Sequence, residues 1–214
     1  SVDRRLAAIG ATDVLGYARR AEADEEGTLA RLAALRGDAD DPAVARHHGH
    51  VIKSIGDGLL IEFASVVAAV RCATDIQAET ARFNANTPAE RQMHLRIGVH
   101  LGAVVVQNGD LLGDGVNIAA RLEQIAEPGS IYLSHAAREQ LTGKISQPLE
   151  DLGERQLNNV ARPVQVYRIV TAAGPRPAAA PHGAFRRKWR YAAAAAVIIP
   201  LIALGSWWLW RELG

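Results

Sequence analysis

Residues 48–63, HGHVIKSIGDGLLIEF, carry the pattern that decides the fold. Two apolar runs flank Gly56-Asp57-Gly58, and an Asp-Gly pair between such runs is a strong signal for a β-hairpin. On both sides of this hairpin, segments with strand-like and helix-like patterns alternate. The hairpin is therefore expected at the centre of a domain that mixes helices and strands.

Before the hairpin, the chain has the pattern of a strand followed by a helix. Residues 4–15 form an apolar run that ends near Asp13 and Gly16, which is typical of a strand entering a turn. A helix is expected over residues 20–36, where leucines recur at helical spacing: Leu29, Leu32 and Leu35.

Beyond the hairpin, further elements are expected in a regular order. They are a helix over 65–83, strands over 95–101 and 104–106, a helix over 115–126 on which Asp114 is the expected N-cap, a strand over 130–134, a helix over 135–141 and a strand over 163–170. This order favours an α+β fold, an α/β sandwich with a ferredoxin-like βαββαβ core. We expect the helices to cover one face of a mostly antiparallel sheet.

Composition excludes several classes of protein. The chain has 214 residues, with 24 Lys and Arg against 23 Asp and Glu. A net charge of +1 argues against a nucleic-acid partner, because general nucleic-acid binders carry a strong basic excess. The single cysteine, Cys72, excludes an intrachain disulfide and a cysteine-rich metal site, so a reducing compartment is expected.

The C-terminal part differs from the domain expected over residues 1–172. Residues 173–190 are rich in Pro and Ala and end in a basic cluster, and 191–210 contain no charged residue. At helical rise this run spans roughly 30 Å, the thickness of a bilayer's hydrocarbon core. We expect a linker, a transmembrane helix and a short tail at 211–214, although a buried Ala-rich helix is the alternative. Interfacial aromatic residues flank the run: Trp189, Tyr191, Trp207, Trp208 and Trp210.

The charges around this run also predict its orientation. Basic residues precede the run, and only Arg211 and Glu212 follow it. By the positive-inside tendency, the N-terminal domain is expected in the cytoplasm, on a single-pass anchor in the cell inner membrane.

Two aspartates at expected strand ends are candidate metal ligands. Asp13 and Asp57 each lie near a glycine at the lip of the sheet, where a carboxylate can face a ligand. Paired carboxylates commonly hold Mg²⁺ or Mn²⁺ against substrate phosphates, because hard cations prefer oxygen ligands. The alternative for Asp57 is that Asp-Gly is simply a favoured turn dipeptide.

Two further pairs could contact a nucleotide. Asn117 and Arg121 are four residues apart on an expected helix and so share a face, where they could hold a sugar oxygen and a phosphoryl group. Lys53 and Asp110 could offer a donor and an acceptor to polar base edges. The alternatives are a solvated or capping pair for the first two and surface charge for the others.

Several motifs in the same order resemble the catalytic domain of class III nucleotidyl cyclases, in particular bacterial adenylate cyclases. The resemblance covers about residues 4–170 and rests on four segments: RRLAAIGATDVLGYARR (4–20), HGHVIKSIGDGLLIEF (48–63), LRIGVHLGAVVV (95–106) and GDLLGDGVNIAARLEQIAEPG (109–129). It implies an enzyme that converts ATP into 3′,5′-cyclic AMP and pyrophosphate.

The resemblance also implies roles for these residues. Asp13 and Asp57 match the ligands of two Mg²⁺ or Mn²⁺ ions per site, and Asn117 and Arg121 match the pair that orients the ribose and stabilises transition-state charge. The other matches are the adenine-selecting pair, Lys53 and Asp110, and the backbone beside the triphosphate, at Val14, Leu15, Gly16 and Tyr17.

In this family the metal-binding residues come from one subunit, and the adenine and transition-state groups come from the other. This chain carries both sets, so a homodimer with two shared sites is implied. Two other functions stay open: a catalytically silent cyclase-like module for nucleotide sensing or dimerisation, and a guanylate cyclase.

The chain departs from the family at two places. Asn158 and Asn159 stand near the position where relatives usually carry a lysine for the terminal phosphates, and Arg155 or Arg162 could replace that lysine. Ala103 stands where animal enzymes often have arginine.

Overall fold

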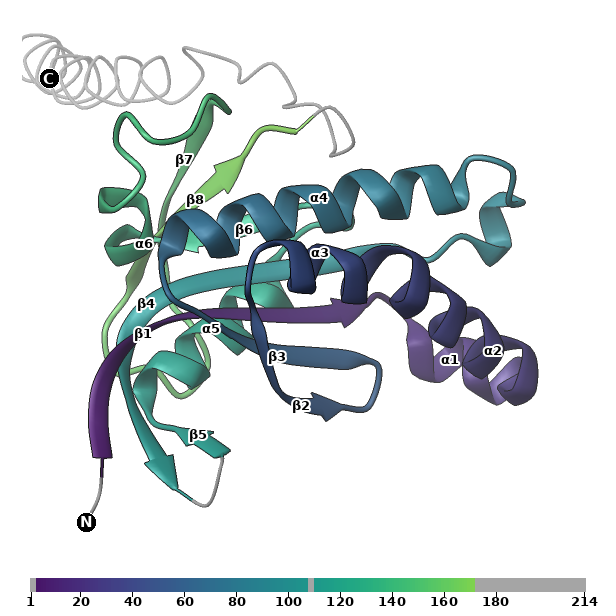
Figure 1. Cartoon of the computed structure of the whole chain (residues 1–214), viewed down its shortest axis with the longest axis horizontal. Helices are drawn as coiled ribbons and strands as arrows, with labels where there is room; N and C mark the ends of the chain where they lie inside the picture. The colour runs from purple at the N-terminus through teal and green to yellow at the C-terminus, as the bar shows by residue number, and fades with distance from the viewer. Residues whose placement is uncertain (1–2, 108–109, 172–214) are drawn as a thin grey trace, which may run out of the picture. The chain divides into compact units, whose positions relative to one another are not determined.

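The computed structural model of the chain describes residues 3–107 and 110–171 (Figure 1). The strands are β1 (Asp3–Val14), β2 (His50–Ile55), β3 (Gly58–Phe63), β4 (Leu95–Gln107), β5 (Asp110–Leu112), β6 (Ile131–Ser134), β7 (Leu149–Arg155) and β8 (Val164–Ile169). The helices are α1 (Tyr17–Ala23), α2 (Glu25–Leu35), the π-helical turn η1 (Arg36–Asp40), α3 (Asp41–Arg46), α4 (Val66–Asn84), the 3₁₀ turn η2 (Ala89–Arg91), α5 (Asp114–Ile125) and α6 (His135–Glu139).

These strands form one sheet in the order β2-β3-β1-β4-β6-β8-β7, and β5 pairs with β4. Only the β4–β6 pair is parallel, and the other pairs are antiparallel. The first four strands lie in the order β2-β3-β1-β4 and alternate with helices as a βαββαβ unit does. The predicted α+β fold with a mostly antiparallel sheet is confirmed.

Helices cover both faces of the sheet, so the expectation of a single covered face is wrong. On one face α4 packs on residues such as Ile61, Ile97 and Val99. On the other face Ala119 of α5 packs against a cluster that includes Ile9. Figure 1 shows α4 and α5 on opposite sides of the sheet. The alternation of apolar residues shows that each helix buries a face, but it does not specify which side of the sheet that face meets.

The close fit of α5 depends on Gly98 of β4. A Cβ atom added at Gly98 would overlap the carbonyl oxygen of Ala119 and lie 2.5 Å from the backbone nitrogen of Glu123. Gly98→Ala is therefore expected to lower the free energy of unfolding by about 1–3 kcal/mol, because α5 must shift outward. Urea unfolding measures this change. Gly37→Ala is the matched control, since a Cβ there meets nothing within 4 Å, and an equal loss in both variants would contradict the packing argument.

Strand β4 also carries a buried histidine. His100 is 8% exposed, its Nδ1 lies 2.7 Å from the Ser134 hydroxyl oxygen, and burial lowers its pKa from 6.5 to about 4. Because folding lowers the pKa of His100, the neutral imidazole favours the folded state. This contribution to the free energy of unfolding is complete above pH 6.5 and is lost as the pH falls towards 4.

From pH 7.5 to pH 5, the unfolding free energy of the wild type should therefore drop by about 2 kcal/mol more than that of His100→Gln. Urea unfolding at the two pH values tests this difference. Substitution of the exposed His135 by Gln should leave the wild-type pH dependence unchanged. Identical pH profiles for His100→Gln and the wild type would show that His100 does not carry the effect.

The segment predicted as one helix over 20–36 is two helices. Asp24 adopts an extended conformation between α1 and α2, and its side chain accepts a hydrogen bond from the Gly27 amide at 3.0 Å. The aspartate thus acts as the N-cap of α2 and interrupts the helix.

The short elements α3, β5 and β7 were not predicted, and the two strands expected over 95–106 are the single strand β4.

The linker predicted over 173–190, the transmembrane helix over 191–210 and the tail over 211–214 lie outside the described residues. Among the residues that the structure does describe, no helix is long and apolar enough to cross a bilayer.

Candidate active site

The end of β1 and the turn of the β2–β3 hairpin bring the two predicted metal ligands together. Asp57 lies in the turn, and its Oδ2 accepts a hydrogen bond from the backbone N–H of Val14 at 3.0 Å. The turn approaches β1 so closely that a Cβ on Gly58 would overlap the carbonyl oxygen of Thr12. Asp57 is therefore held beside Asp13, the residue before Val14.

The two carboxyl groups affect each other electrostatically. Burial raises the pKa of Asp57, and the neighbouring carboxyl of Asp13 raises it further. A cation bound by both carboxylates would remove the repulsion between them. Mg²⁺ is typically bound through one or two carboxylates plus substrate phosphates. The donor set of Asp13 and Asp57 fits such an ion. In residues 3–107 and 110–171, no three His, Cys, Asp or Glu side chains gather as a metal site.

Two charged residues that the sequence did not indicate complete this corner of the site. Arg96 forms an ion pair with Asp13, and the same guanidinium nitrogen lies 3.0 Å from Oε1 of Glu123 on α5. Burial and the Asp13 carboxyl raise the pKa of Glu123 to about 8, although Arg96 opposes this shift. The only signal for Arg96 was a charge within an alternating strand. Its contact with Asp13 follows from the β1–β4 register, which pairs the two residues.

The predicted phosphate loop, residues 14–17, connects β1 to α1 directly beside Asp13. Gly16 has a φ of 71°, a left-handed conformation that suits glycine. The backbone N–H of Leu15 donates a hydrogen bond to the carbonyl oxygen of His94 at 2.9 Å, and Tyr17 packs against the core. The loop is therefore fixed to the segment before β4.

The predicted adenine-selecting residues also meet. Lys53 on β2 and Asp110 on β5 are 57 positions apart, yet Nζ of Lys53 lies 2.7 Å from Oδ2 of Asp110. The lysine lowers the pKa of the aspartate, and the other carboxylate oxygen accepts the N–H of Leu111 at 2.8 Å. A cationic donor and an anionic acceptor are thus presented side by side.

Asn117 and Arg121 lie on the side of α5 that faces away from the sheet. Asn117 is exposed, and Arg121 donates a hydrogen bond to Oε1 of Gln124 at 2.7 Å. In the part of the chain that the structure describes, neither makes a hydrogen bond or ion pair with Asp13 or Asp57. One subunit thus presents two separate sets of site residues.

The start of α5 differs from expectation. Asp114 is the first residue of the helix, and its predecessor Gly113 occupies the N-cap position without a side-chain hydrogen bond. The predicted N-cap role of Asp114 is therefore wrong.

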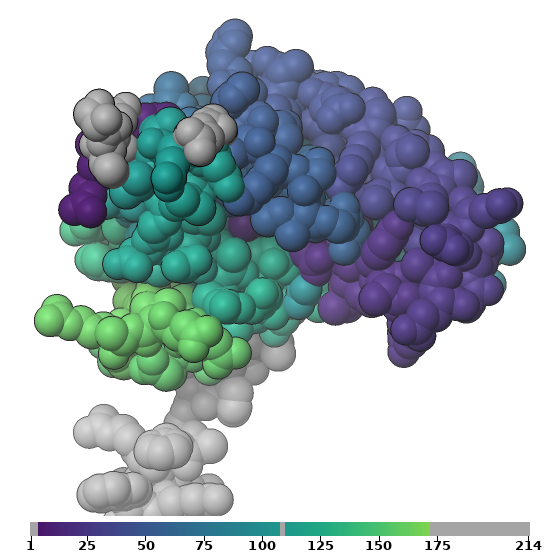
Figure 2. Space-filling model, turned by 90° about the horizontal axis from the view of Figure 1, so that it is seen from below, coloured from purple at the N-terminus to yellow at the C-terminus, as the bar shows by residue number. Residues whose placement is uncertain are grey.

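These elements share one face of the domain. Figure 2 shows this face, where the surface of the β2–β3 hairpin, in blue, lies beside that of β5 and α5, in teal, and α1 continues it in purple.

The possible replacements for the missing phosphate lysine, Arg155 and Arg162, are both exposed. Asn159 has a φ of 60° in the turn between β7 and β8.

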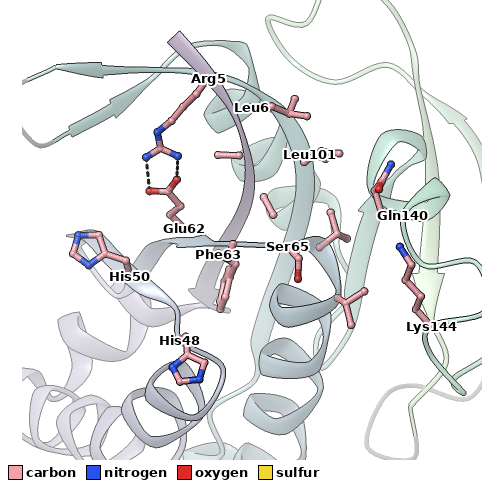
Figure 3. A pocket seen from close by; sticks show the side chains of 15 residues that line it. Arg5, Leu6, His48, His50, Glu62, Phe63, Ser65, Leu101, Gln140 and Lys144 are labelled. Carbon is pink, nitrogen blue, oxygen red and sulfur yellow. Dashed lines mark hydrogen bonds and ion pairs between the residues drawn. The ribbon is translucent and has the colours of Figure 1, made fainter. Parts of the chain in front are cut away.

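A cavity of about 510 Å³ lies away from these residues, along the N-terminal half of β1 (Figure 3). Its wall contains the Arg5–Glu62 ion pair, Phe63 and Lys144. None of the predicted site residues lines it, so this cavity is not the candidate nucleotide site.

A βαββαβ core with two carboxylates at the end of its first strand and its hairpin is the arrangement that the resemblance to class III nucleotidyl cyclases implies. Residues 12–170 match the family described as "Adenylate and Guanylate cyclase catalytic domain". The chain belongs to this family.

Known proteins agree with this assignment. Over 167 residues the chain is 42% identical to "Putative adenylate cyclase 3" of Rhizobium meliloti, a match that covers 78% of this chain and 28% of that protein. It is 31% identical over 140 residues to an adenylate cyclase of Streptomyces coelicolor, a match that covers 65% of this chain and 35% of that protein. The chain thus spans about a third or less of these relatives.

Solved structures show the same fold. An adenylate/guanylate cyclase/hydrolase from Silicibacter pomeroyi superposes with a TM-score of 0.75 at 39% identity, covering 80% of this chain and 99% of that one. The adenylyl cyclase CyaB from P. aeruginosa superposes with a TM-score of 0.72 at 21% identity, covering 82% and 98%. At that identity, the second likeness concerns the fold alone.

Proposed function

We propose that this chain is an adenylate cyclase that converts ATP into 3′,5′-cyclic AMP and pyrophosphate. The observation that carries the choice of ATP is the Lys53–Asp110 pair, whose charged atoms lie 2.7 Å apart. Adenine has an amino group at its 6-position, which can donate a hydrogen bond to a carboxylate, whereas guanine has an acceptor oxygen there. Asp110 therefore favours adenine, and Lys53 can donate to a neighbouring ring nitrogen. The names of the relatives above support the same choice.

In the proposed reaction, the ribose 3′-oxygen attacks the α-phosphorus in line with the leaving pyrophosphate. A bond forms from O3′ to phosphorus, the bond to the β-phosphate oxygen breaks, and the hydroxyl proton is released. Asn117 orients the ribose, and Arg121 places positive charge where negative charge develops on the phosphoryl group. Mg²⁺ or Mn²⁺ held by Asp13 and Asp57 would lower the pKa of the 3′-hydroxyl and neutralise phosphate charge.

We further propose that the active unit is a symmetric homodimer. Within the described residues of one chain, neither Asn117 nor Arg121 makes a hydrogen bond or ion pair with Asp13 or Asp57. A two-fold arrangement would let the carboxylates of one subunit meet the helix face of the other, and it would form two such sites.

Product analysis with ATP and GTP, each with Mg²⁺ or Mn²⁺, tests the proposal on the purified chain. We expect cyclic AMP from ATP and far less cyclic GMP from GTP. A chain that binds ATP but makes no cyclic nucleotide is a silent nucleotide-sensing or dimerisation module. Preferred formation of cyclic GMP would identify a guanylate cyclase and overturn the assigned role of Lys53 and Asp110.

We also propose that the protein is anchored in the cell inner membrane by residues 191–210, with the catalytic domain over 1–172 in the cytoplasm and 173–190 as the linker. The support is the uncharged run and its basic N-terminal flank. The chain should stay with the membranes after a carbonate wash. Ile199→Asp combined with Ile202→Asp should release it, since each charge costs about 3 kcal/mol at the centre of a spanning helix. Release of the unaltered chain would contradict the anchor.

A further inference from the structure

A second cavity, of about 620 Å³, lies between the α1–α2 helices and the segment that joins α4 to β4. Its volume is within the range of pockets that hold small molecules. Three arginines from three different elements line it: Arg20 of α1, Arg31 of α2 and Arg91 of η2. None of the residues assigned above to the nucleotide site lies in its wall.

Two of these guanidinium groups are held in place by the surrounding protein. Arg31 donates to Oγ1 of Thr87 at 2.7 Å and lies over the ring of Phe83, 4.7 Å from its centroid. Arg20 donates to the carbonyl oxygen of Glu90 at 3.2 Å. In both arginines, however, the Nε–H is buried and has no acceptor within the described part of the chain. A buried cationic donor without an acceptor is costly, so the surrounding protein leaves part of the hydrogen-bonding capacity of both guanidinium groups unused.

The charges around the cavity favour an anion. Arg91 is exposed, and its guanidinium group makes no hydrogen bond or ion pair with the residues that the structure describes, although its backbone N–H donates to the carbonyl oxygen of Pro88. Two carboxylates, Asp24 and Glu90, also line the cavity, but Asp24 is engaged as the N-cap of α2 by the amide of Gly27. Three guanidinium groups against these two carboxylates leave the wall positive.

The rest of the lining is mostly apolar. Phe83 is partly buried and Met93 is fully buried, and both line the cavity. Gly27 and Thr28 also line it, and three alanines complete the lining: Ala23, Ala30 and Ala34. An inorganic anion would leave this surface uncovered, whereas a ligand with an apolar body would cover it.

We propose that this cavity binds a small organic anion: a phosphate or carboxylate head group held by the arginines, and an apolar body packed on Phe83 and Met93. The head group would receive charge-assisted hydrogen bonds from guanidinium groups of separate elements, which gives both affinity and orientation.

Binding there would reach the candidate active site through one hydrogen bond. The η2 turn leads into His94, whose carbonyl oxygen accepts the Leu15 N–H at 2.9 Å, and Leu15 follows Asp13 by two residues. A ligand that contacts α1, α2 and η2 would therefore hold the segment of Leu15 and the segment of His94 in a fixed relative position. The expected effect of the ligand on the active site rests on the proposed function. The binding of the ligand does not.

Phenyl phosphate, which combines an anionic head with an apolar ring, is the probe for this cavity, and calorimetric titration of the full chain measures its binding. We expect saturable binding by the wild type. Binding should be about tenfold weaker in Arg91→Gln and in Arg31→Gln, because each variant loses one charge-assisted hydrogen bond. Arg71→Gln, which removes an exposed charge on α4, should bind as the wild type does. Because the side chain of Arg91 has no described partner, its variant tests the proposal even if Arg31→Gln fails to fold.

Three controls separate this cavity from other binding. Inorganic phosphate and benzyl alcohol should each bind far more weakly than phenyl phosphate. Arg121→Gln should bind the probe unchanged, which excludes the nucleotide site, where this guanidinium group would hold a phosphoryl group. Hydrogen exchange of the Leu15 amide should slow when the probe is bound. Absence of binding, equal binding by Arg91→Gln, or equal binding of benzyl alcohol would overturn the proposal. None of these results depends on cyclase activity.

Discussion

Replacing Asp57 with alanine is expected to lower cyclase turnover by about a thousandfold or more while the chain stays folded. The variant loses one of the two carboxylates that would hold the divalent ions, and the loss of several kcal/mol of transition-state stabilisation corresponds to a rate change of this size. The effect on folding should be small. The Val14 N–H loses an acceptor, but the repulsion between Asp57 and Asp13 disappears with it.

The measurement is the rate of cyclic AMP formation with Mn²⁺, together with Mn²⁺ binding followed by electron paramagnetic resonance. Asp38→Ala is the matched control, because Asp38 is an exposed aspartate in η1. It should retain both turnover and metal binding. Wild-type turnover by Asp57→Ala would show that this carboxylate is not a metal ligand.

A second large effect is expected when two inactive variants are mixed. Asp13→Ala removes a carboxylate, and Arg121→Ala removes the guanidinium on the other set of site residues, so each homodimer should be nearly inactive. After random exchange of subunits, half of the dimers are mixed, and each mixed dimer has one intact site. Activity should therefore recover to about a quarter of the wild-type value.

Mixing Asp13→Ala with Asp57→Ala is the control, because both changes affect the same set of residues and no combination of these subunits forms an intact site. Two different affinity tags would confirm that subunits exchange. If exchange occurs and the first mixture stays inactive, the site is not shared between subunits.

Local patterns in the sequence predicted the parts of the site that depend on local structure. The Asp-Gly turn placed Asp57 at the tip of a hairpin, and the end of the apolar run placed Asp13 at the end of β1. The structure brings these two carboxyl groups together, and it also pairs Lys53 with Asp110. The roles implied for these residues stay predictions until the variants are measured.

The contacts that the sequence did not predict depend on strand pairing and helix placement. Arg96 meets Asp13 only because β1 and β4 pair in one register, and Glu123 joins them only because α5 lies on that face of the sheet. Neither fact leaves a periodic signal along the chain. The three-residue strand β5, which carries Asp110, is too short to show a strand pattern.

The missing side chain at Gly98 has a consequence for how the proposed dimer would work. Since α5 rests directly on the backbone of β4, the helix that carries Arg121 has no space to move closer to the strand that carries Arg96. Sliding or tilting of α5 by itself would disrupt this packing. Closure around the substrate would then require rotation of one whole subunit against the other.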